Sequence, residues 1–205
     1  MKYFAHRGLS SVNKDNSELS ISEAIKHGYY GVELDVQLSS DNELILCHDL
    51  YMNDKFVNDL SCDELESMGI ISLKYVYENI HLSNTQILLD IKGTNVYIIN
   101  MLIEFYNTRN HENVTFCSFN RNLAHLIPSF FNRGVIFESI LHKSEYNVMT
   151  SGFDSVVIHW TCLCSEFNEF CRKNNIKIFT YTHKEKMEIE YMKKFEIDYI
   201  ITNGI

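Results

Sequence analysis

Three carboxylates interrupt stretches that otherwise have the apolar character of buried strands. Glu33 and Asp35 lie within the run 31–36, and Asp90 lies within the run 87–91. Residues two apart on a strand point to the same face, so Glu33 and Asp35 should lie side by side. Buried acids repel one another unless a cation is held among them, and ligation by oxygen alone favours Mg²⁺, Ca²⁺ or Mn²⁺ over zinc. We therefore expect these three residues to form a divalent-cation site.

Two histidines and two basic residues accompany the carboxylates. His6 and Arg7 end the first apolar run, His48 follows a short run after the second, and Lys92 lies two residues beyond Asp90. Histidine exchanges protons near neutral pH, so the two histidines are candidates for general base and general acid. Arg7 and Lys92 supply the positive charge that binds a phosphate group. Taken alone, Asp90 and Lys92 could equally form a simple interior ion pair.

Short apolar runs alternate with amphipathic stretches along the whole sequence, which predicts parallel β-α-β units. The predicted strands are 3–6, 31–36, 87–91, 114–118, 134–138, 155–159, 177–181 and 199–202. The predicted helices are 17–27, 96–106, 122–131, 166–173 and 184–195. Eight strands favour a closed (β/α)₈ barrel, in which polar residues at the strand ends converge on one site. The alternative is an open doubly wound sheet, but no G-x-G-x-x-G follows any strand.

The connection after the second strand is too short for a crossover helix. A polar turn at 39–43 leads into the apolar run 44–47 and then His48, which predicts a hairpin extension or loop carrying His48 over the barrel mouth. The stretch 50–82 has room only for a small inserted subdomain. We expect one minimal barrel domain over 1–205, with the last helix missing and a second copy of the chain covering the last strand.

Composition narrows the function classes. The chain has 205 residues, 45% hydrophobic and 22% charged, with 18 Lys and Arg against 27 Asp and Glu, a net charge of −9. This charge disfavours a nucleic-acid or anionic-membrane surface. Neither a signal peptide nor a run of 18 apolar residues is visible, so we expect a cytoplasmic protein without a transmembrane segment. The six cysteines form no C-x-x-C pair and should be reduced, and a cluster of Cys162, Cys164 and Cys171 lacks a fourth metal ligand.

The residues that could take part in catalysis or binding occur in a recognisable order. They read Ala5-His6-Arg7-Gly8, Asp15-Asn16-Ser17, Gly28, Glu33-x-Asp35-Val36, His48-Asp49 and Asp90-Ile91-Lys92. This order resembles the glycerophosphodiester phosphodiesterases, which belong with the phosphatidylinositol-specific phospholipase C-like barrels. The match is dense over 4–49 and looser through 118–119, 179–182 and 197–203. The resemblance implies catalytic roles for His6 and His48, metal ligation by Glu33, Asp35 and Asp90, phosphate or glycerol contacts from Arg7 and Lys92, and an aromatic pocket wall at Tyr181.

Several positions depart from the family pattern. Asp90 stands where Glu is usual, Asp15 stands where Glu is usual, and Tyr181 stands where Trp is common. Asn203 replaces a usual Asp after the last strand, and an Arg often found shortly after the second His-Asp is absent. None of these changes removes a catalytic histidine, so we expect an active enzyme.

The implied reaction is metal-assisted hydrolysis of a glycerophosphodiester to glycerol 3-phosphate and an alcohol. We favour His6 as base and His48 as acid, and the nucleophile is either water or the neighbouring glycerol hydroxyl. There are two alternatives, of which the first uses the same site. One is lysophospholipase D-type hydrolysis of a monoacyl phospholipid, with Tyr51, Phe56, Trp160 and Tyr181 as its apolar surface. The other is a non-catalytic barrel that binds a phosphodiester or a protein partner.

Overall fold

Eight parallel strands form a closed barrel in the computed structural model, which describes residues 1–82 and 84–204. The ring closes because β1 pairs with β11 on one side and with β2 on the other. The barrel prediction is confirmed, and the open doubly wound sheet is wrong. In chain order the barrel strands are β1 (Lys2–His6), β2 (Gly31–Leu38), β6 (Gln86–Ile91), β7 (Val114–Ser118), β8 (Asn132–Phe137), β9 (Ser155–His159), β10 (Lys177–His183) and β11 (Tyr199–Thr202). Each predicted strand matches the observed one to within two residues.

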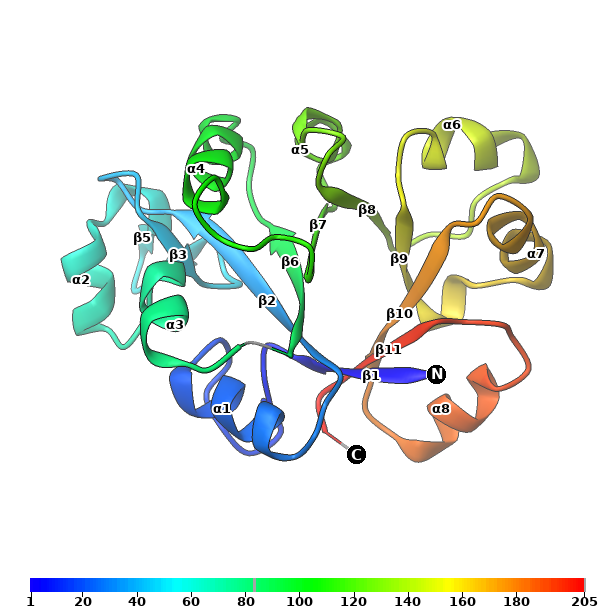
Figure 1. Ribbon diagram of the computed structural model, residues 1–205, viewed down its shortest axis with the longest axis horizontal. Helices are drawn as coiled ribbons and strands as arrows, with labels where there is room; N and C mark the ends of the chain where they lie inside the picture. The colour runs from blue at the N-terminus through cyan, green and yellow to red at the C-terminus, as the bar shows by residue number, and fades with distance from the viewer. Residues whose placement is uncertain (83, 205) are drawn as a thin grey trace.

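Helices surround the barrel on the outside, as Figure 1 shows. They are α1 (Glu18–Lys26), α2 (Cys62–Ser67), α3 (Leu73–Asn79), α4 (Tyr97–Tyr106), α5 (Arg121–Leu126), α6 (Tyr146–Thr150), α7 (Ser165–Lys173) and α8 (Lys186–Met192). Single 3₁₀ turns occur at η1 (Val57–Asp59), η2 (Lys143–Glu145) and η3 (Trp160–Cys162). The helix predicted at 122–131 is too long, because Ile127 precedes Pro128 and adopts an extended backbone that ends α5. The short helix α6 was not predicted.

The connection after β2 contains a hairpin and a small insertion. Strand β3 (Leu44–Leu46) runs antiparallel to β2, which confirms the predicted hairpin extension. The two-residue strands β4 (Tyr51–Met52) and β5 (Lys55–Phe56) form a separate hairpin before α2 and α3. Each of these helices begins at a serine whose side chain caps the first turn, Ser61 for α2 and Ser72 for α3. The insertion has its own small apolar cluster, formed by Ile45, Cys47, Val57, Leu60, Leu65 and Ile70.

Aromatic side chains fill the amino-terminal half of the barrel interior. The Phe4 ring packs edge-on against Phe179 and Tyr199, with 5.3 Å between centroids in each pair. Gly31 makes room for Phe4, because a Cβ atom at Gly31 would lie 2.4 Å from that ring. Above this layer the inward side chains are Leu88, Cys117, Ile136, Val157 and Ile201. With this apolar base filled, the polar inward residues gather at the carboxyl ends of the strands, where barrel enzymes place their sites.

Residues of α1 and α8 line a groove on the outer surface. No helix follows β11 within the part of the chain that the structure describes, and the groove, of about 910 Å³, lies beside it. In Figure 1 the chain leaves β11 between these two helices. The second copy predicted to cover this strand stays a prediction.

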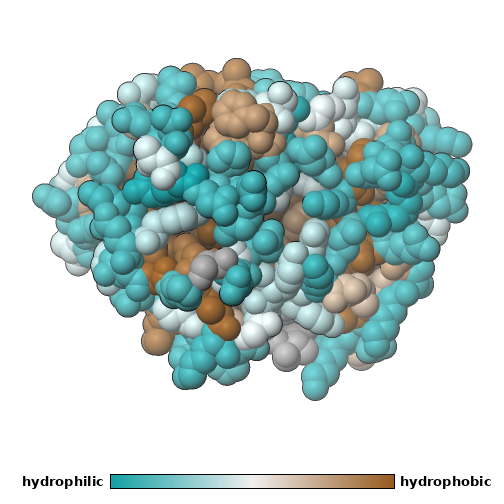
Figure 2. Space-filling model, in the orientation of Figure 1, coloured by the Kyte–Doolittle hydropathy of each residue, from teal (hydrophilic) through white to brown (hydrophobic). Residues whose placement is uncertain are grey.

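Hydrophilic residues cover most of the face shown in Figure 2, in keeping with the net charge of −9. Among residues 1–82 and 84–204, no helix combines the length and the apolar character needed to cross a bilayer.

Candidate active site

A cavity of about 190 Å³ opens at the carboxyl ends of the barrel strands. All eight residues predicted from the sequence to form the site line this one cavity: His6, Arg7, Glu33, Asp35, His48, Asp90, Lys92 and Tyr181. Four of them come from adjacent strands in register, since Glu33 lies opposite His6 and Asp35 lies opposite Asp90. The barrel therefore brings together residues that are far apart in the sequence.

The three carboxylates form a compact buried group. Glu33, Asp35 and Asp90 are 6%, 1% and 4% exposed, and each offers an oxygen within 4.8 Å of the others. The Oδ1 atom of Asp90 is buried and has no hydrogen-bond partner among the described residues. A buried carboxylate oxygen without a partner is costly, which makes it a natural ligand for a cation. The donor set is oxygen only, so the residues present fit Mg²⁺, Ca²⁺ or Mn²⁺.

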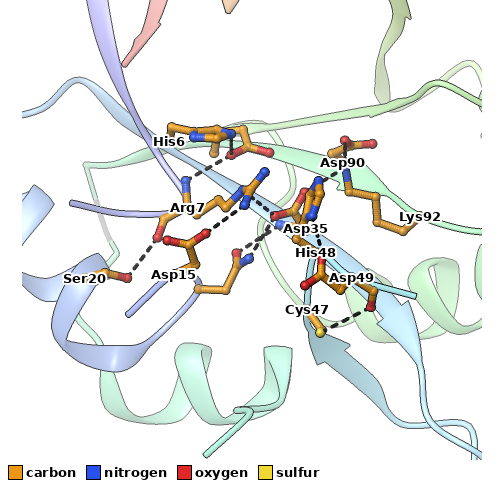
Figure 3. Close-up of polar contacts among 12 residues, drawn as sticks. His6, Arg7, Asp15, Ser20, Asp35, Cys47, His48, Asp49, Asp90 and Lys92 are labelled. Carbon is orange, nitrogen blue, oxygen red and sulfur yellow. Dashed lines mark hydrogen bonds and ion pairs between the residues drawn. The ribbon is translucent and has the colours of Figure 1, made fainter. Parts of the chain in front are cut away.

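Two basic side chains already neutralise part of this negative charge (Figure 3). The Lys92 ammonium lies 2.9 Å from Asp35 Oδ1 and also donates to Asp90 Oδ2. The Arg7 guanidinium donates to Asp15 Oδ2 at 2.7 Å, and its Nε atom lies 3.3 Å from Asp35 Oδ2. When all three buried carboxylates are ionised, these two positive charges leave a net negative charge that a bound cation would offset.

Protonation of the site follows from burial and these charges. Burial and the neighbouring Asp35 carboxylate raise the pKa of Glu33 well above its usual range. Burial also raises the pKa of Asp90 to about 6. For Asp35 burial acts in the same direction, but Lys92 and Arg7 outweigh it and hold its pKa below the usual value. Lys92 and Arg7 thus favour the ionised form of Asp35, whereas burial favours the protonated form of Glu33, which a bound cation would oppose.

Arg7 enters the cavity because the chain turns sharply after β1. Its backbone has a φ of 56°, and Gly8 follows at 77°. A Cβ atom at Gly8 would lie 2.5 Å from the Ser20 backbone, so only glycine fits this approach. The Ser20 hydroxyl donates to the Arg7 carbonyl at 2.9 Å. The amino-terminal turn of α1 thereby holds the Arg7 backbone in place.

His6 lies between the end of β11 and the carboxylates. Its Nδ1 atom is 2.6 Å from Asn203 Oδ1, and its Nε2 atom is 3.9 Å from Glu33 Oε2. Burial, reinforced by the Arg7 charge, lowers the pKa of His6 to about 4. The imidazole is therefore neutral at physiological pH and able to accept a proton.

His48 approaches from the loop after β3. Its Nδ1 atom lies 2.9 Å from Asp49 Oδ1, and its side chain is 41% exposed. The Gln37 amide donates to the carbonyls of Cys47 and Asp49, at 2.8 Å each. Gln37 points inward from β2 as Glu33 and Asp35 do, so the strand that carries two carboxylates also fixes the loop that carries His48.

Tyr181 and Phe119 form an aromatic wall of the cavity. The Tyr181 hydroxyl donates to the Phe137 carbonyl at 2.9 Å, so the ring rather than the hydroxyl is presented to a ligand. Phe119 packs edge-on against Tyr181 at 6.1 Å between centroids. Glu138 also lines the cavity, is exposed, and has no hydrogen bond or ion pair with any described residue.

Four contributors to the site received no role from the sequence. Asn16 lies in the motif order and Asn203 stands in place of a usual Asp, but nothing in the spacing tied the side chain of Asn16 to Asp35 or that of Asn203 to His6. Gln37 could have been found, because it continues the alternate inward positions of β2. Glu138 ends a run assigned to a strand and carried no signal of its own.

Comparison with known proteins gives a consistent result. The model described as the glycerophosphoryl diester phosphodiesterase family matches residues 6–144. The glycerophosphodiester phosphodiesterase of Caldanaerobacter subterraneus subsp. tengcongensis is 28% identical, over 97% of this chain and 92% of that relative.

Two solved structures share the fold. A glycerophosphodiester phosphodiesterase from Thermotoga maritima superposes with a TM-score of 0.84 at 24% identity, covering 99% of this chain and 94% of that one. An Oleispira antarctica phosphodiesterase, solved in complex with the product sn-glycerol-3-phosphate, superposes at 0.87 and 18% identity, covering 99% and 93%. The family match spans more than half of the sequence, so this chain belongs to the glycerophosphoryl diester phosphodiesterase family and is a phosphodiester hydrolase.

Proposed function

We propose that this protein hydrolyses glycerophosphodiesters to glycerol 3-phosphate and an alcohol, with a divalent cation and two histidines. The observation that carries the proposal is the convergence of three buried carboxylates, two basic side chains and two histidines on one cavity. Glycerol 3-phosphate as product is also supported by the Oleispira antarctica relative, which was solved with that molecule bound.

Glu33, Asp35 and Asp90 would hold the cation. When bound there, a divalent cation supplies the missing positive charge and polarises a phosphoryl oxygen. Arg7 and Lys92 bind the remaining phosphate oxygens and stabilise the charge that grows on the phosphoryl group in the transition state. Both side chains line the cavity, and both already contact carboxylates, so their positions are fixed before substrate arrives.

Each histidine carries out one of the two proton transfers. His6 takes a proton from the nucleophile, and His48 gives a proton to the departing alkoxide. His6 lies at the end of β1 and His48 on the loop after β3, so the two rings enter the cavity from different elements. The exposed position of His48 suits a group that must meet a leaving alcohol at the mouth of the site.

A lysophospholipid is a second candidate substrate, favoured by exposed apolar residues beside the mouth. Leu50 and Tyr51 follow directly after His48 and Asp49 and are 48% and 65% exposed, and Phe56 pairs with Tyr51 across the β4–β5 hairpin. Phe119, 47% exposed, lines the cavity itself. Trp160 does not line the cavity. No observation favours the non-catalytic binding barrel.

A matrix of metals and substrates tests the proposal. Purified protein is assayed with Mg²⁺, Ca²⁺ or Mn²⁺ against several glycerophosphodiesters and against lysophosphatidylcholine, with His6→Ala as the blank. Release of glycerol 3-phosphate that requires the cation supports the proposal. Release of lysophosphatidic acid alone would support the second candidate instead. A wild-type rate equal to the His6→Ala rate on every substrate would refute both.

A further inference from the structure

His6 and Asn203 are joined by a short hydrogen bond between the two edges that close the barrel. Nδ1 of His6 lies 2.6 Å from Oδ1 of Asn203, although 197 residues separate them in the sequence. The contact exists because β1 and β11 are parallel neighbours and both residues lie at their carboxyl ends. An amide oxygen only accepts hydrogen bonds, so Nδ1 must carry a proton, and in the neutral ring Nε2 then carries the lone pair.

The backbone around Asn203 fixes the direction of its side chain. Its N–H donates to the His183 carbonyl at 3.2 Å, and its carbonyl accepts from the Ser11 N–H at 3.0 Å. Gly204 follows with a φ of 117°, and a Cβ atom there would lie 2.5 Å from the Ser11 hydroxyl. The loop after β1 and the end of β10 therefore hold Asn203 from both sides.

The other ring nitrogen of His6 is left for the reaction. No residue within 1–82 and 84–204 donates to or accepts from Nε2 in a hydrogen bond, and the 3.9 Å separation from Glu33 Oε2 exceeds hydrogen-bonding distance. Glu33 Oε2 instead accepts from the Arg7 backbone N–H at 3.0 Å. His6 lines the cavity, so its Nε2 lone pair is presented there.

The second histidine has a partner of different charge. His48 Nδ1 lies 2.9 Å from the Asp49 carboxylate, a partner that carries a negative charge. The neutral amide of Asn203 gives His6 no such charge compensation. The two partners therefore favour different roles for two otherwise identical side chains.

We propose that Asn203 is a positioning residue that holds His6 in the tautomer protonated at Nδ1, so that Nε2 serves as the proton acceptor of the reaction. This inference rests on the proposed function for the reaction itself, but the tautomer is a property of the protein without substrate. It also gives Asn203, which replaces the Asp usual in the family, a defined task in this chain.

Nitrogen NMR of protein labelled at the histidine rings tests the tautomer directly. His6→Gln identifies the His6 signals by their disappearance. We expect the wild-type protein to show a protonated Nδ1 and an unprotonated Nε2 at His6. The reverse pattern would mean that the amide is turned and donates to Nδ1, and it would overturn the inference whether or not the enzyme turns over.

Two variants at Asn203 separate positioning from simple support of the fold. Asn203→Leu keeps a similar volume but removes the acceptor, and we expect a mixture of tautomers with kcat reduced about 10- to 100-fold and KM within about twofold of wild type. Asn203→Asp keeps an acceptor at this position and should keep the Nδ1-protonated form. An unchanged kcat in Asn203→Leu would overturn the inference. If Asn203→Leu does not fold, the His6 tautomer observed in the wild-type protein and in Asn203→Asp still tests the inference.

Discussion

Asn16 and Asp35 are joined by two hydrogen bonds that run in opposite directions. The Asn16 side-chain N–H donates to Asp35 Oδ2 at 2.8 Å, and the Asp35 backbone N–H donates to Asn16 Oδ1 at 3.1 Å. Asn16 is 4% exposed and sits at a φ of 54°, a backbone conformation that asparagine tolerates better than most residues. One side chain thus connects the loop before α1 to the central carboxylate of the site and sets the direction of that carboxylate.

Replacing Asn16 with alanine should weaken both the fold and the metal site. The buried Asp35 carboxylate loses a hydrogen-bond donor, which should lower the free energy of unfolding by about 1–3 kcal/mol. The affinity for the divalent cation should fall about 10- to 100-fold, because the ligand is no longer oriented. Urea unfolding and titration calorimetry measure the two effects. Asn42→Ala is the matched control, because Asn42 also has a positive φ but is exposed; equal losses in both variants would contradict the role given to Asn16.

Divalent cations should stabilise the protein through Asp90. A cation at about 100 times its dissociation constant raises the free energy of unfolding by about 2.7 kcal/mol, which thermal unfolding detects. Asp90→Asn should remove most of this gain, whereas the exposed Asp63→Asn should retain it. Because the pKa of Asp90 is about 6, protons compete with the metal below that pH and the gain should shrink as the pH falls from 7 to 5. A gain that Asp90→Asn leaves intact would place the cation elsewhere.

His183 should make the fold sensitive to acid. Its side chain is completely buried, its Nε2 lies 2.9 Å from the Thr180 hydroxyl, and burial lowers its pKa from 6.5 to about 4. Between these two values the unfolded chain binds a proton that the folded chain does not. The free energy of unfolding should therefore fall as the pH decreases from 6.5 to 4, by about 3 kcal/mol from this group.

Comparing how the free energy of unfolding changes with pH in wild type and in His183→Gln isolates this contribution. His183→Gln should lose less stability than wild type over the same pH interval, whatever its stability at pH 7. Parallel slopes for wild type and His183→Gln would show that another group is responsible.

Glu138 should favour diesters with a cationic alcohol. The carboxylate lines the cavity near the Phe119 and Tyr181 rings, and aromatic faces beside an acid suit an ammonium group. Glu138→Gln should raise KM for a choline diester about two- to fivefold, as expected for an exposed charge, and leave KM for a diester of a neutral alcohol unchanged. The exposed Glu78→Gln is the control. Equal changes for both substrates would remove this role from Glu138.

Much of the fold was predictable because its signals are local. Apolar runs separated by amphipathic stretches marked all eight barrel strands, and the short link after β2 marked the hairpin that carries His48. The end of α5 was misplaced because an apolar pattern continued past Ile127, although Pro128 ends the helix there.

The site residues that could be predicted were those whose charge conflicted with a buried position. Glu33, Asp35 and Asp90 were conspicuous because acids rarely occur in apolar runs without a function. Asn16 and Asn203 gave no such signal, because a neutral amide is unremarkable in a loop and its partner is set by tertiary structure. Closure of the barrel alone determines that Asn203 meets His6 rather than solvent.

A phosphorus NMR time course of sn-glycerol 3-phosphocholine with wild-type enzyme and a divalent cation tests the central claim most directly. It follows substrate, product and any cyclic phosphate in one experiment. We predict that the substrate signal is replaced by that of glycerol 3-phosphate, and that folded His6→Gln and His48→Gln are each at least about 100-fold slower. Formation of phosphocholine in place of glycerol 3-phosphate, or a wild-type rate in either histidine variant, would contradict the account.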